Sequence, residues 1–204
     1  MSLPVSRSSS TITSKCARLI PALDQQKLID HVCAERHPNR NEVTALLSSA
    51  SGHRAGEIAE LGWLMVSEVS GRLSASIDVG RHIAKKGNGR RIPSHSEVRA
   101  AIKVLHAEQR RLKRGAVRRS ERGGHMSAKS FANRFAAQFP EFEFHGCSSH
   151  SGRRTMITIT ARSLAEVGGS LRDVQELAGR RSLATTEGYI QGDRAIQRRL
   201  SGLV

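Results

Sequence analysis

Four short stretches of this 204-residue chain carry side chains whose types and spacing suit phosphate chemistry. An arginine at one expected helix start is followed one turn later by an acidic residue. A histidine and an arginine lie one turn apart at another helix start, two adjacent lysines lie between these stretches, and the chain's single tyrosine follows a further arginine. The residues are Arg54 with Glu57, Lys85 with Lys86, His150 with Arg153, and Arg180 with Tyr189.

Arginine suits phosphate because its planar guanidinium stays charged and donates two parallel hydrogen bonds to phosphate oxygens. His150 and Arg153 are three residues apart, so both can reach one phosphate from the same helical face. Histidine also gains or loses a proton near neutral pH. The pattern therefore indicates chemistry at a phosphate group.

Charge is the strongest compositional signal. The chain has 33 Lys and Arg against 18 Asp and Glu, a formal net charge of +15. A polyanion is the natural partner and nucleic acid is the first candidate, with a ribosome-associated protein or a membrane-surface binder as alternatives. Three cysteines without metal-ligand spacing argue against a disulfide framework and for a reducing, cytoplasmic location. We expect no secretory signal and no membrane-spanning helix.

The elements that must position these residues are mostly helical in pattern. Apolar residues at helical spacing predict one helix capped by Asp24 and ended by Pro38, a second over about 42–49, and a third from near Ala55. Alternating apolar residues then predict a strand over 73–79, with Leu73, Ala75, Ile77 and Val79 on one side.

A second extended piece runs through Ile83, and Asn88-Gly89 before Arg90–Pro93 is a strong signal for a tight hairpin turn. We therefore predict a small antiparallel sheet whose turn carries the two lysines. A long helix is expected over 97–113, followed by a mobile, exposed loop over 114–124.

The remainder is again helical in pattern. Ser127 is expected to cap a helix that Pro140 ends, with three phenylalanines on one face: Phe131, Phe135 and Phe139. Further helices are expected over 153–167, over 171–177 after a Ser170 cap, from Ser182 toward Tyr189, and over 193–200. The prediction is an α+β, mostly helical domain over 21–204, behind a flexible segment at 1–20.

The motif order resembles the tyrosine recombinases, also called phage integrases. An arginine, a hairpin lysine, a His-x-x-Arg motif and a Ser-x-x-Thr-Thr-x-x-Tyr motif follow one another at integrase-like intervals between Arg54 and Tyr189. The phrases SSHSGRRT, LRDVQELAG and SLATTEGYI are especially similar to phage and mobile-element integrases. The match covers about Leu23 to Ile190 and implies the catalytic-domain fold of a DNA breaking–rejoining enzyme.

The resemblance implies a site-specific recombinase that works without a metal or nucleotide cofactor. Tyr189 would attack the scissile phosphate and hold the 3′ end of the DNA as a phosphotyrosine. Arg54 and Arg153 would bind the non-bridging oxygens of the scissile phosphate. Losing one such donor costs on the order of 3–4 kcal/mol of transition-state stabilisation. His150 would act as general acid–base. Glu57 resembles the family's acidic partner, which orients Arg54 or a neighbour.

In the family, a hairpin lysine protonates the leaving 5′-hydroxyl. Counting back from Pro93 favours Lys85, whereas Lys86 takes the role if the turn is one residue shorter. Arg154, next to Arg153, is expected to point elsewhere on its helix.

Two departures from the family pattern keep other functions open. Arg180 stands where the family has histidine or sometimes tryptophan, and its longer side chain is harder to aim at phosphate. Nothing before Leu23 is expected to fold into the family's separate DNA-clamping domain. The alternatives are therefore a catalytically impaired DNA-binding remnant or a type IB topoisomerase-like activity. The expected partner is double-stranded DNA, with self-association as a tetramer on it, at the bacterial nucleoid.

Overall fold

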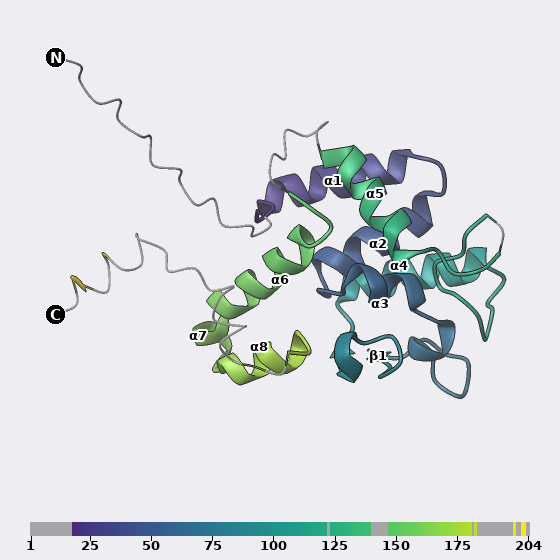
Figure 1. Ribbon diagram of the computed structural model, residues 1–204. Coiled ribbons are helices and arrows are strands. Elements are labelled where there is room, and N and C mark those ends of the chain that lie inside the picture. Colours follow the sequence, from purple (N-terminus) through teal and green to yellow (C-terminus); the bar gives the residue numbers. More distant parts are fainter. Residues whose placement is uncertain are drawn as a thin grey trace, which may run out of the picture.

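The computed structural model describes residues 18–121, 123–139, 147–180, 182, 198 and 201–202, which form a mostly helical fold with one two-stranded antiparallel sheet (Figure 1). The helices are α1 (Ala22–Ala34), α2 (Pro38–Ser49), α3 (Ala55–Glu60), α4 (Ser96–Glu108), α5 (Ala128–Gln138), α6 (Ser151–Arg162), α7 (Leu164–Val167) and α8 (Leu171–Leu177). The strands are β1 (Ser76–Val79) and β2 (Arg90–Pro93), and the 3₁₀ turns are η1 (Trp63–Met65) and η2 (Lys85–Gly87). The predicted α+β, mostly helical class is confirmed. None of the described helices is long and apolar enough to cross a membrane.

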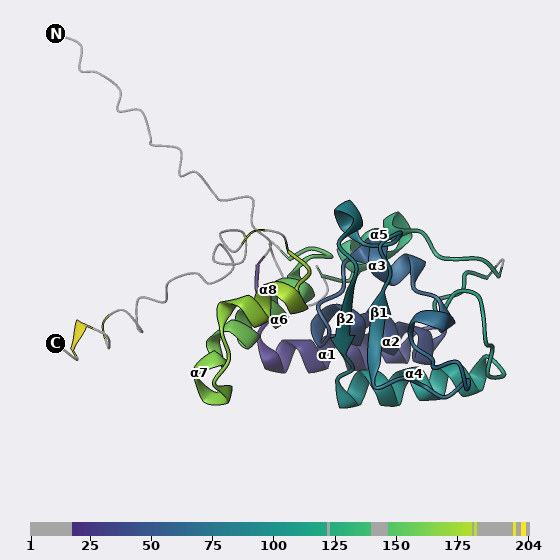
Figure 2. The same cartoon turned by 90° about the horizontal axis from the view of Figure 1, so that it is seen from below.

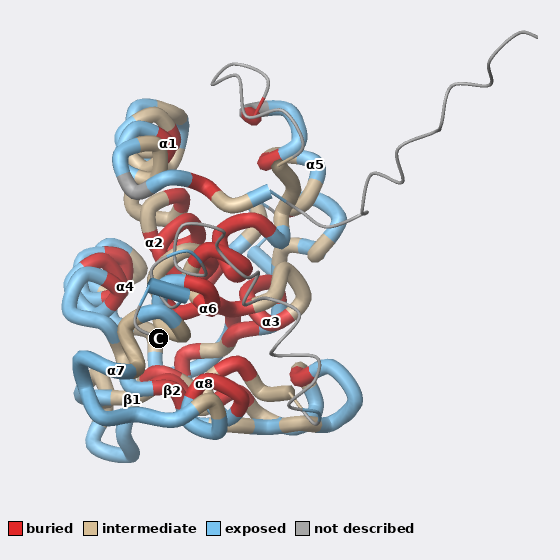
Figure 3. The backbone as a smooth tube through the Cα atoms, turned by 90° about the vertical axis from the view of Figure 1, so that its left-hand side faces the viewer, coloured by how far each residue is buried: buried red, intermediate tan, exposed pale blue. Residues whose placement is uncertain are grey.

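Helix α2 lies at the centre of the fold, where it contacts α1, α4 and α6. Its aliphatic side chains Val43, Leu46 and Leu47 are at most 4% exposed. Figure 3 shows many buried residues in α2, α3 and α6, and exposed residues on the outer side of α4. Leu, Ile and Val make up most of the buried hydrophobic residues in the described part of the chain. Burying one such side chain contributes about 1.5–3 kcal/mol relative to leaving it exposed.

The first two helices begin at other residues than predicted. Pro21, not Asp24, occupies the N-cap position of α1, and Asp24 lies in the first turn, where the helix dipole favours a carboxylate. Helix α2 begins at Pro38 rather than near Glu42. Proline fits the first helical position because its missing N–H has no helical partner there.

Strand β1 is shorter than the predicted strand over 73–79. Only Ser76–Val79 pairs with β2, and Ala75 is exposed instead of sharing the buried side of Ile77 and Val79. The predicted alternation is therefore correct only for the second half of the segment.

The connection between the strands spans residues 80–89, so the predicted tight turn at Asn88-Gly89 is wrong. Asn88 has φ −85°, outside the left-handed region that such a turn requires. The residues with positive φ are Lys86 (60°) and Gly87 (69°), which form the 3₁₀ turn η2. The longer connection carries both lysines, as expected.

Helix α4 ends at Glu108, and the prediction that it continues to Lys113 is wrong. Gln109 donates from Nε2 to the carbonyl of Val117 at 2.9 Å, and its Oε1 accepts a hydrogen bond from Nε1 of the buried Trp63 at 3.2 Å. The chain leaves the helical path directly after Gln109, at Arg110 with φ 55°.

The prediction of an exposed loop over 114–124 is wrong for its centre. Ala116, Val117 and Arg118 are at most 4% exposed, and the guanidinium of Arg118 lies 5.2 Å from the ring centre of Phe131. Apolar side chains placed between charged ones anchor this segment to the core, which its basic composition conceals.

Helix α5 matches its prediction closely. The Ser127 hydroxyl accepts the N–H of Ser130 at 3.0 Å as an N-cap, and the three phenylalanines of one face are at most 6% exposed. Pro140, the predicted stop, lies outside the described residues.

The predicted helix over 153–167 is wrong as a single element. Helix α6 begins at Ser151, a break at Ser163 separates it from the short α7, and Gly168 with φ 64° ends α7. Ser170 and Asp173 form a capping box at α8, which confirms the predicted cap. The helix expected from Ser182 toward Tyr189 lies outside the described residues, apart from Ser182 itself, as does most of the expected tail helix.

The described chain is already packed at Ile20. Its side chain is 2% exposed, and its N–H donates to Oγ1 of Thr155 at 2.8 Å. Residues 1–17 lie outside the described residues, so the predicted division between 1–20 and 21–204 stays a prediction.

Candidate active site

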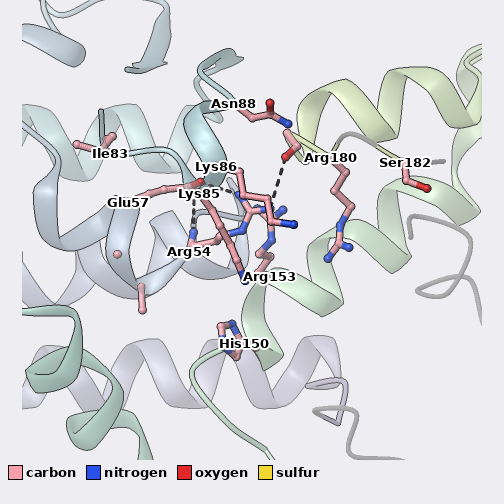
Figure 4. Close-up of a pocket in the computed structure, with 13 residues that line it drawn as sticks. Arg54, Glu57, Ile83, Lys85, Lys86, Asn88, His150, Arg153, Arg180 and Ser182 are labelled. Carbon is pink, nitrogen blue, oxygen red and sulfur yellow. Dashed lines mark hydrogen bonds and ion pairs between the residues drawn. The ribbon is translucent and has the colours of Figure 1, made fainter. Parts of the chain in front are cut away.

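A cleft of about 660 Å³ opens between α3, the connection of the two strands, the start of α6 and the end of α8 (Figure 4). Figure 2 shows α8 beside the β2 edge of the sheet, with α6 next to α8, and the contacts of α8 with β2 and α6 bring distant parts of the chain to this cleft. The predicted residues that line it are Arg54, Glu57, Lys85, Lys86, His150, Arg153 and Arg180. Tyr189 lies outside the described residues.

Arg54 and Glu57 are coupled at the start of α3. The Arg54 N–H donates to Oε2 of Glu57 at 2.9 Å, and its Nη1 donates to Oε1 at 2.7 Å. Its Nη2 donates to the carbonyl of Gly179 at 3.5 Å. The local turn therefore fixes the guanidinium of Arg54 at the cleft, where the side chain is 19% exposed.

Glu57 is the buried anion of the site, with 1% of its side chain exposed. Its second arginine partner is Arg90, which donates Nη1 to Oε1 and Nη2 to Oε2, both at 2.9 Å. Burial alone would raise the pKa of Glu57, but the hydrogen bonds and charges of Arg90 and Arg54 outweigh it and lower the pKa to about 2. Glu57 is therefore ionised at neutral pH.

Arg153 lies deeper, 3% exposed, on the first turn of α6. It donates Nη1 to the carbonyl of Gly52 and Nη2 to the carbonyl of Ala178. Burial, followed by the charge of Arg54, lowers the pKa of Arg153 to about 9, so it keeps its charge at neutral pH. Arg54 and Arg153 both line the cleft, as Figure 4 shows.

His150 occupies the N-cap position of α6 and remains accessible to solvent. Partial burial lowers the pKa of its imidazole, and the charges of Arg153, Lys85 and Arg54 lower it further. A neutral imidazole can accept a proton, which suits a general base.

Both lysines of η2 line the cleft (Figure 4). Lys85 is the one whose charge lowers the pKa of His150, whereas Lys86 adopts the left-handed φ of 60°. This proximity supports Lys85 as the proton donor, a role that stays a prediction.

Arg180 reaches the cleft from the turn after α8. Its N–H donates to the carbonyl of Gln175, and Nε2 of Gln175 donates back to the Arg180 carbonyl, both at 3.1 Å. Arg154 is 4% exposed and does not line the cleft, so the neighbour of Arg153 does point elsewhere.

Sequence reasoning missed two buried residues beside the cleft, His53 and Arg90. His53 is fully buried, and the side chain of Arg90 is 6% exposed. A signal for Arg90 was present, because strand alternation places it on the same side as the buried Ile92. A cation on the core side of a strand requires a buried partner.

The cleft thus gathers several cations and a neutral histidine around one concave surface. Such a set can bind a phosphodiester, stabilise added negative charge and exchange a proton with a neighbouring oxygen. Within the described ranges, no three His, Cys, Asp or Glu side chains lie close enough to hold a metal ion.

The phage integrase family model matches residues 19–195. No curated protein sequence matches the chain. Among solved structures, the XerA recombinase is similar with a TM-score of 0.70 and 16% identity, over 96% of this chain and 66% of that one. The integrase from mycobacterium phage Brujita has a TM-score of 0.59 and 25% identity, over 97% of this chain and 58% of that one.

The Tn1549 transposon integrase in complex with transposon right end DNA gives a TM-score of 0.66 at 14% identity, over 90% of this chain and 66% of that one. The present chain therefore spans about two thirds or less of these solved chains. The resemblance drawn from the motifs is confirmed. The chain belongs to the phage integrase family, and its fold is that of the tyrosine recombinase catalytic domain.

Proposed function

We propose that this protein is a site-specific DNA recombinase that cuts and rejoins strands through a covalent bond to Tyr189. The supporting observation is the convergence of Arg54, Lys85, His150, Arg153 and Arg180 on one cleft from separate parts of the chain. The match to the phage integrase family supports the same reaction class.

In the first step, the hydroxyl oxygen of Tyr189 bonds to the scissile phosphorus and the bond to the 5′ oxygen breaks. The phenolic proton passes to His150, whose lowered pKa leaves the imidazole free to accept it. Lys85 delivers a proton to the leaving 5′ oxygen. Rejoining reverses these transfers when a 5′-hydroxyl attacks the phosphotyrosine, so the phosphodiester energy is conserved.

Arg54 and Arg153 stabilise the charge that develops on the non-bridging oxygens. Both guanidiniums are held before substrate binds, Arg54 by Glu57 and Arg153 by two backbone carbonyls. Preorganised donors of this kind are worth on the order of 3–4 kcal/mol each in the transition state.

The proposed substrate is double-stranded DNA, on which we infer that the protein self-associates. The net charge of +15 supports a polyanionic partner. One similar structure is a lambda integrase dimer bound to a COC′ core site, and another is the Tn1549 integrase with transposon right end DNA. In such a complex this chain would supply the catalytic domain.

The test is a set of nicked suicide duplexes tiled across the DNA that flanks the gene of this protein. We expect one duplex to trap a covalent adduct that resists denaturing electrophoresis. Arg153→Lys should abolish the adduct, whereas Arg154→Lys, a change of the neighbouring buried arginine, should retain it. Binding without any adduct would favour the impaired remnant, and site-independent relaxation of supercoiled plasmid would favour a topoisomerase-like activity.

A further inference from the structure

Arg90 is a buried cation that joins three separate parts of the cleft wall. It is the first residue of β2, and only 6% of its side chain is exposed. Its Nη1 and Nη2 each donate to one oxygen of Glu57 at 2.9 Å, and its Nε donates to the carbonyl of Leu177 at 3.0 Å. The guanidinium therefore bridges α3 and the end of α8 from the strand that follows the lysine turn.

The Glu57 carboxylate is shared between Arg90 and Arg54. Each of its oxygens accepts one hydrogen bond from Arg90 and one from Arg54. A carboxylate held bidentately by a buried arginine cannot rotate freely, so its bond to Arg54 keeps a fixed direction. The orientation of Arg54 in the cleft therefore depends on Arg90.

The backbone that presents Arg180 also lies directly against Arg90. Gly179 has φ 58°, and a Cβ added there would lie 2.6 Å from Cδ of Arg90. The carbonyl of Gly179 in turn accepts the weak bond from Arg54 at 3.5 Å. The side chain of Arg90 thus sets how closely the turn after α8 approaches the other cations.

We propose that Arg90 is a positioning residue of the active site, acting on Arg54 through Glu57 and on Arg180 through the Leu177–Gly179 backbone. Arg90 is not among the residues that line the cleft, so it does not touch the phosphate itself. The expected effect of Arg90 on the cleavage rate rests on the proposed function, whereas its role in holding the cleft wall does not.

Lysine cannot replace Arg90 in this role. A single ammonium keeps the charge but cannot span both oxygens of Glu57 and the Leu177 carbonyl in one plane. Arg90→Lys should therefore slow single-turnover cleavage by roughly 10- to 100-fold, the range expected when reacting groups are misplaced. DNA affinity should stay unchanged because the side chain is buried behind the cleft.

The adjacent Arg91 supplies a matched control. Its side chain is 71% exposed and pairs with Asp78 on the outer side of the sheet, at 2.6 Å. Arg91→Lys makes the same chemical change one residue away, and we expect it to leave the cleavage rate unaltered.

The experiment measures cleavage rate, DNA affinity and amide hydrogen exchange over 171–180 in the full chain and both variants. We expect Arg90→Lys alone to slow cleavage at unchanged affinity and to speed exchange near Leu177. Equal rates for the full chain and Arg90→Lys, or equal losses in both variants, would overturn the proposal. If the unaltered protein forms no adduct, the proposed function fails, and exchange alone decides whether Arg90 holds the cleft wall.

Arg90→Gln serves as a second variant in case the lysine variant does not fold. Its side chain ends at the position of the arginine Nε and carries no charge, so it removes both bonds to Glu57, and the same measurements apply. If neither variant folds while Arg91→Lys does, Arg90 supports the whole domain rather than the cleft, and the proposal is overturned.

Discussion

The buried His53 predicts that the fold loses stability in mild acid. The side chain is 0% exposed, so a charge on its ring would be buried away from water. Burial, followed by the charge of Arg90, lowers the pKa of His53 from 6.5 to about 4, and these effects outweigh the opposing charge of Glu57 and a hydrogen bond to the Leu47 backbone. The imidazole is therefore neutral in the folded protein.

The sign and size of the effect follow from this lowered pKa. The unfolded chain binds the proton more readily, so the stabilisation is fully present above pH 6.5 and is lost as the pH falls toward 4. A difference of 2.5 pH units, 6.5 minus 4, corresponds to about 3 kcal/mol of unfolding free energy at about 1.4 kcal/mol per unit. Glu57 loses its own contribution only at lower pH, between 4.5 and about 2.

The assay is urea unfolding of the protein and of His53→Leu, at intervals from neutral pH to about pH 4. Leucine has a similar volume and no ring nitrogen to protonate. The unfolding free energy of His53→Leu should therefore fall by about 3 kcal/mol less than that of the unaltered protein over this pH range. His95→Leu, a change of an exposed histidine, is the control. Parallel declines for the protein and His53→Leu would refute the reasoning.

Three further predictions concern the proposed reaction. DNA affinity should fall roughly a thousandfold or more between about 50 and 200 mM salt if about six phosphates are contacted, and a flat titration would exclude a DNA-facing basic surface. A substrate with a 5′-bridging sulfur should restore cleavage by Lys85→Ala, because that leaving group needs no proton. Restored cleavage by Lys86→Ala instead would assign the proton-donor role to Lys86. Arg180→His should speed single-turnover cleavage by about tenfold if the better-oriented histidine donor lowers the activation free energy by roughly 1.4 kcal/mol. Slower cleavage would show that Arg180 works in place of the family's histidine.

The sequence predicted best where the signals are local. Ser127 caps α5, Ser170 caps α8, and the phenylalanine face of α5 is buried, because capping and helical periodicity act within a few residues. Predictions failed where distant contacts decide the conformation. The turn expected at Asn88 lies instead at Lys86 and Gly87, and α4 ends at Glu108, where Gln109 bonds to Val117 and Trp63.

The site shows the same division. Motif order named the residues that the structure gathers in one cleft, since such motifs lie at helix starts and turns. It did not find Arg90, because a single strand arginine has no motif and its partners Glu57 and Leu177 lie far along the chain. The only indication that Arg90 faces inward was its position two residues before the buried Ile92, which places both side chains on the same side of the strand.

The most direct measurement of the central claim is to locate the bond between protein and DNA. A trapped suicide adduct would be digested with protease and nuclease, and the modified peptide sequenced by mass spectrometry. We expect a 3′-phosphate attached to Tyr189, and no adduct from Tyr189→Phe although that variant still binds DNA. An adduct on another residue, a 5′ linkage, or an adduct persisting in Tyr189→Phe would contradict it.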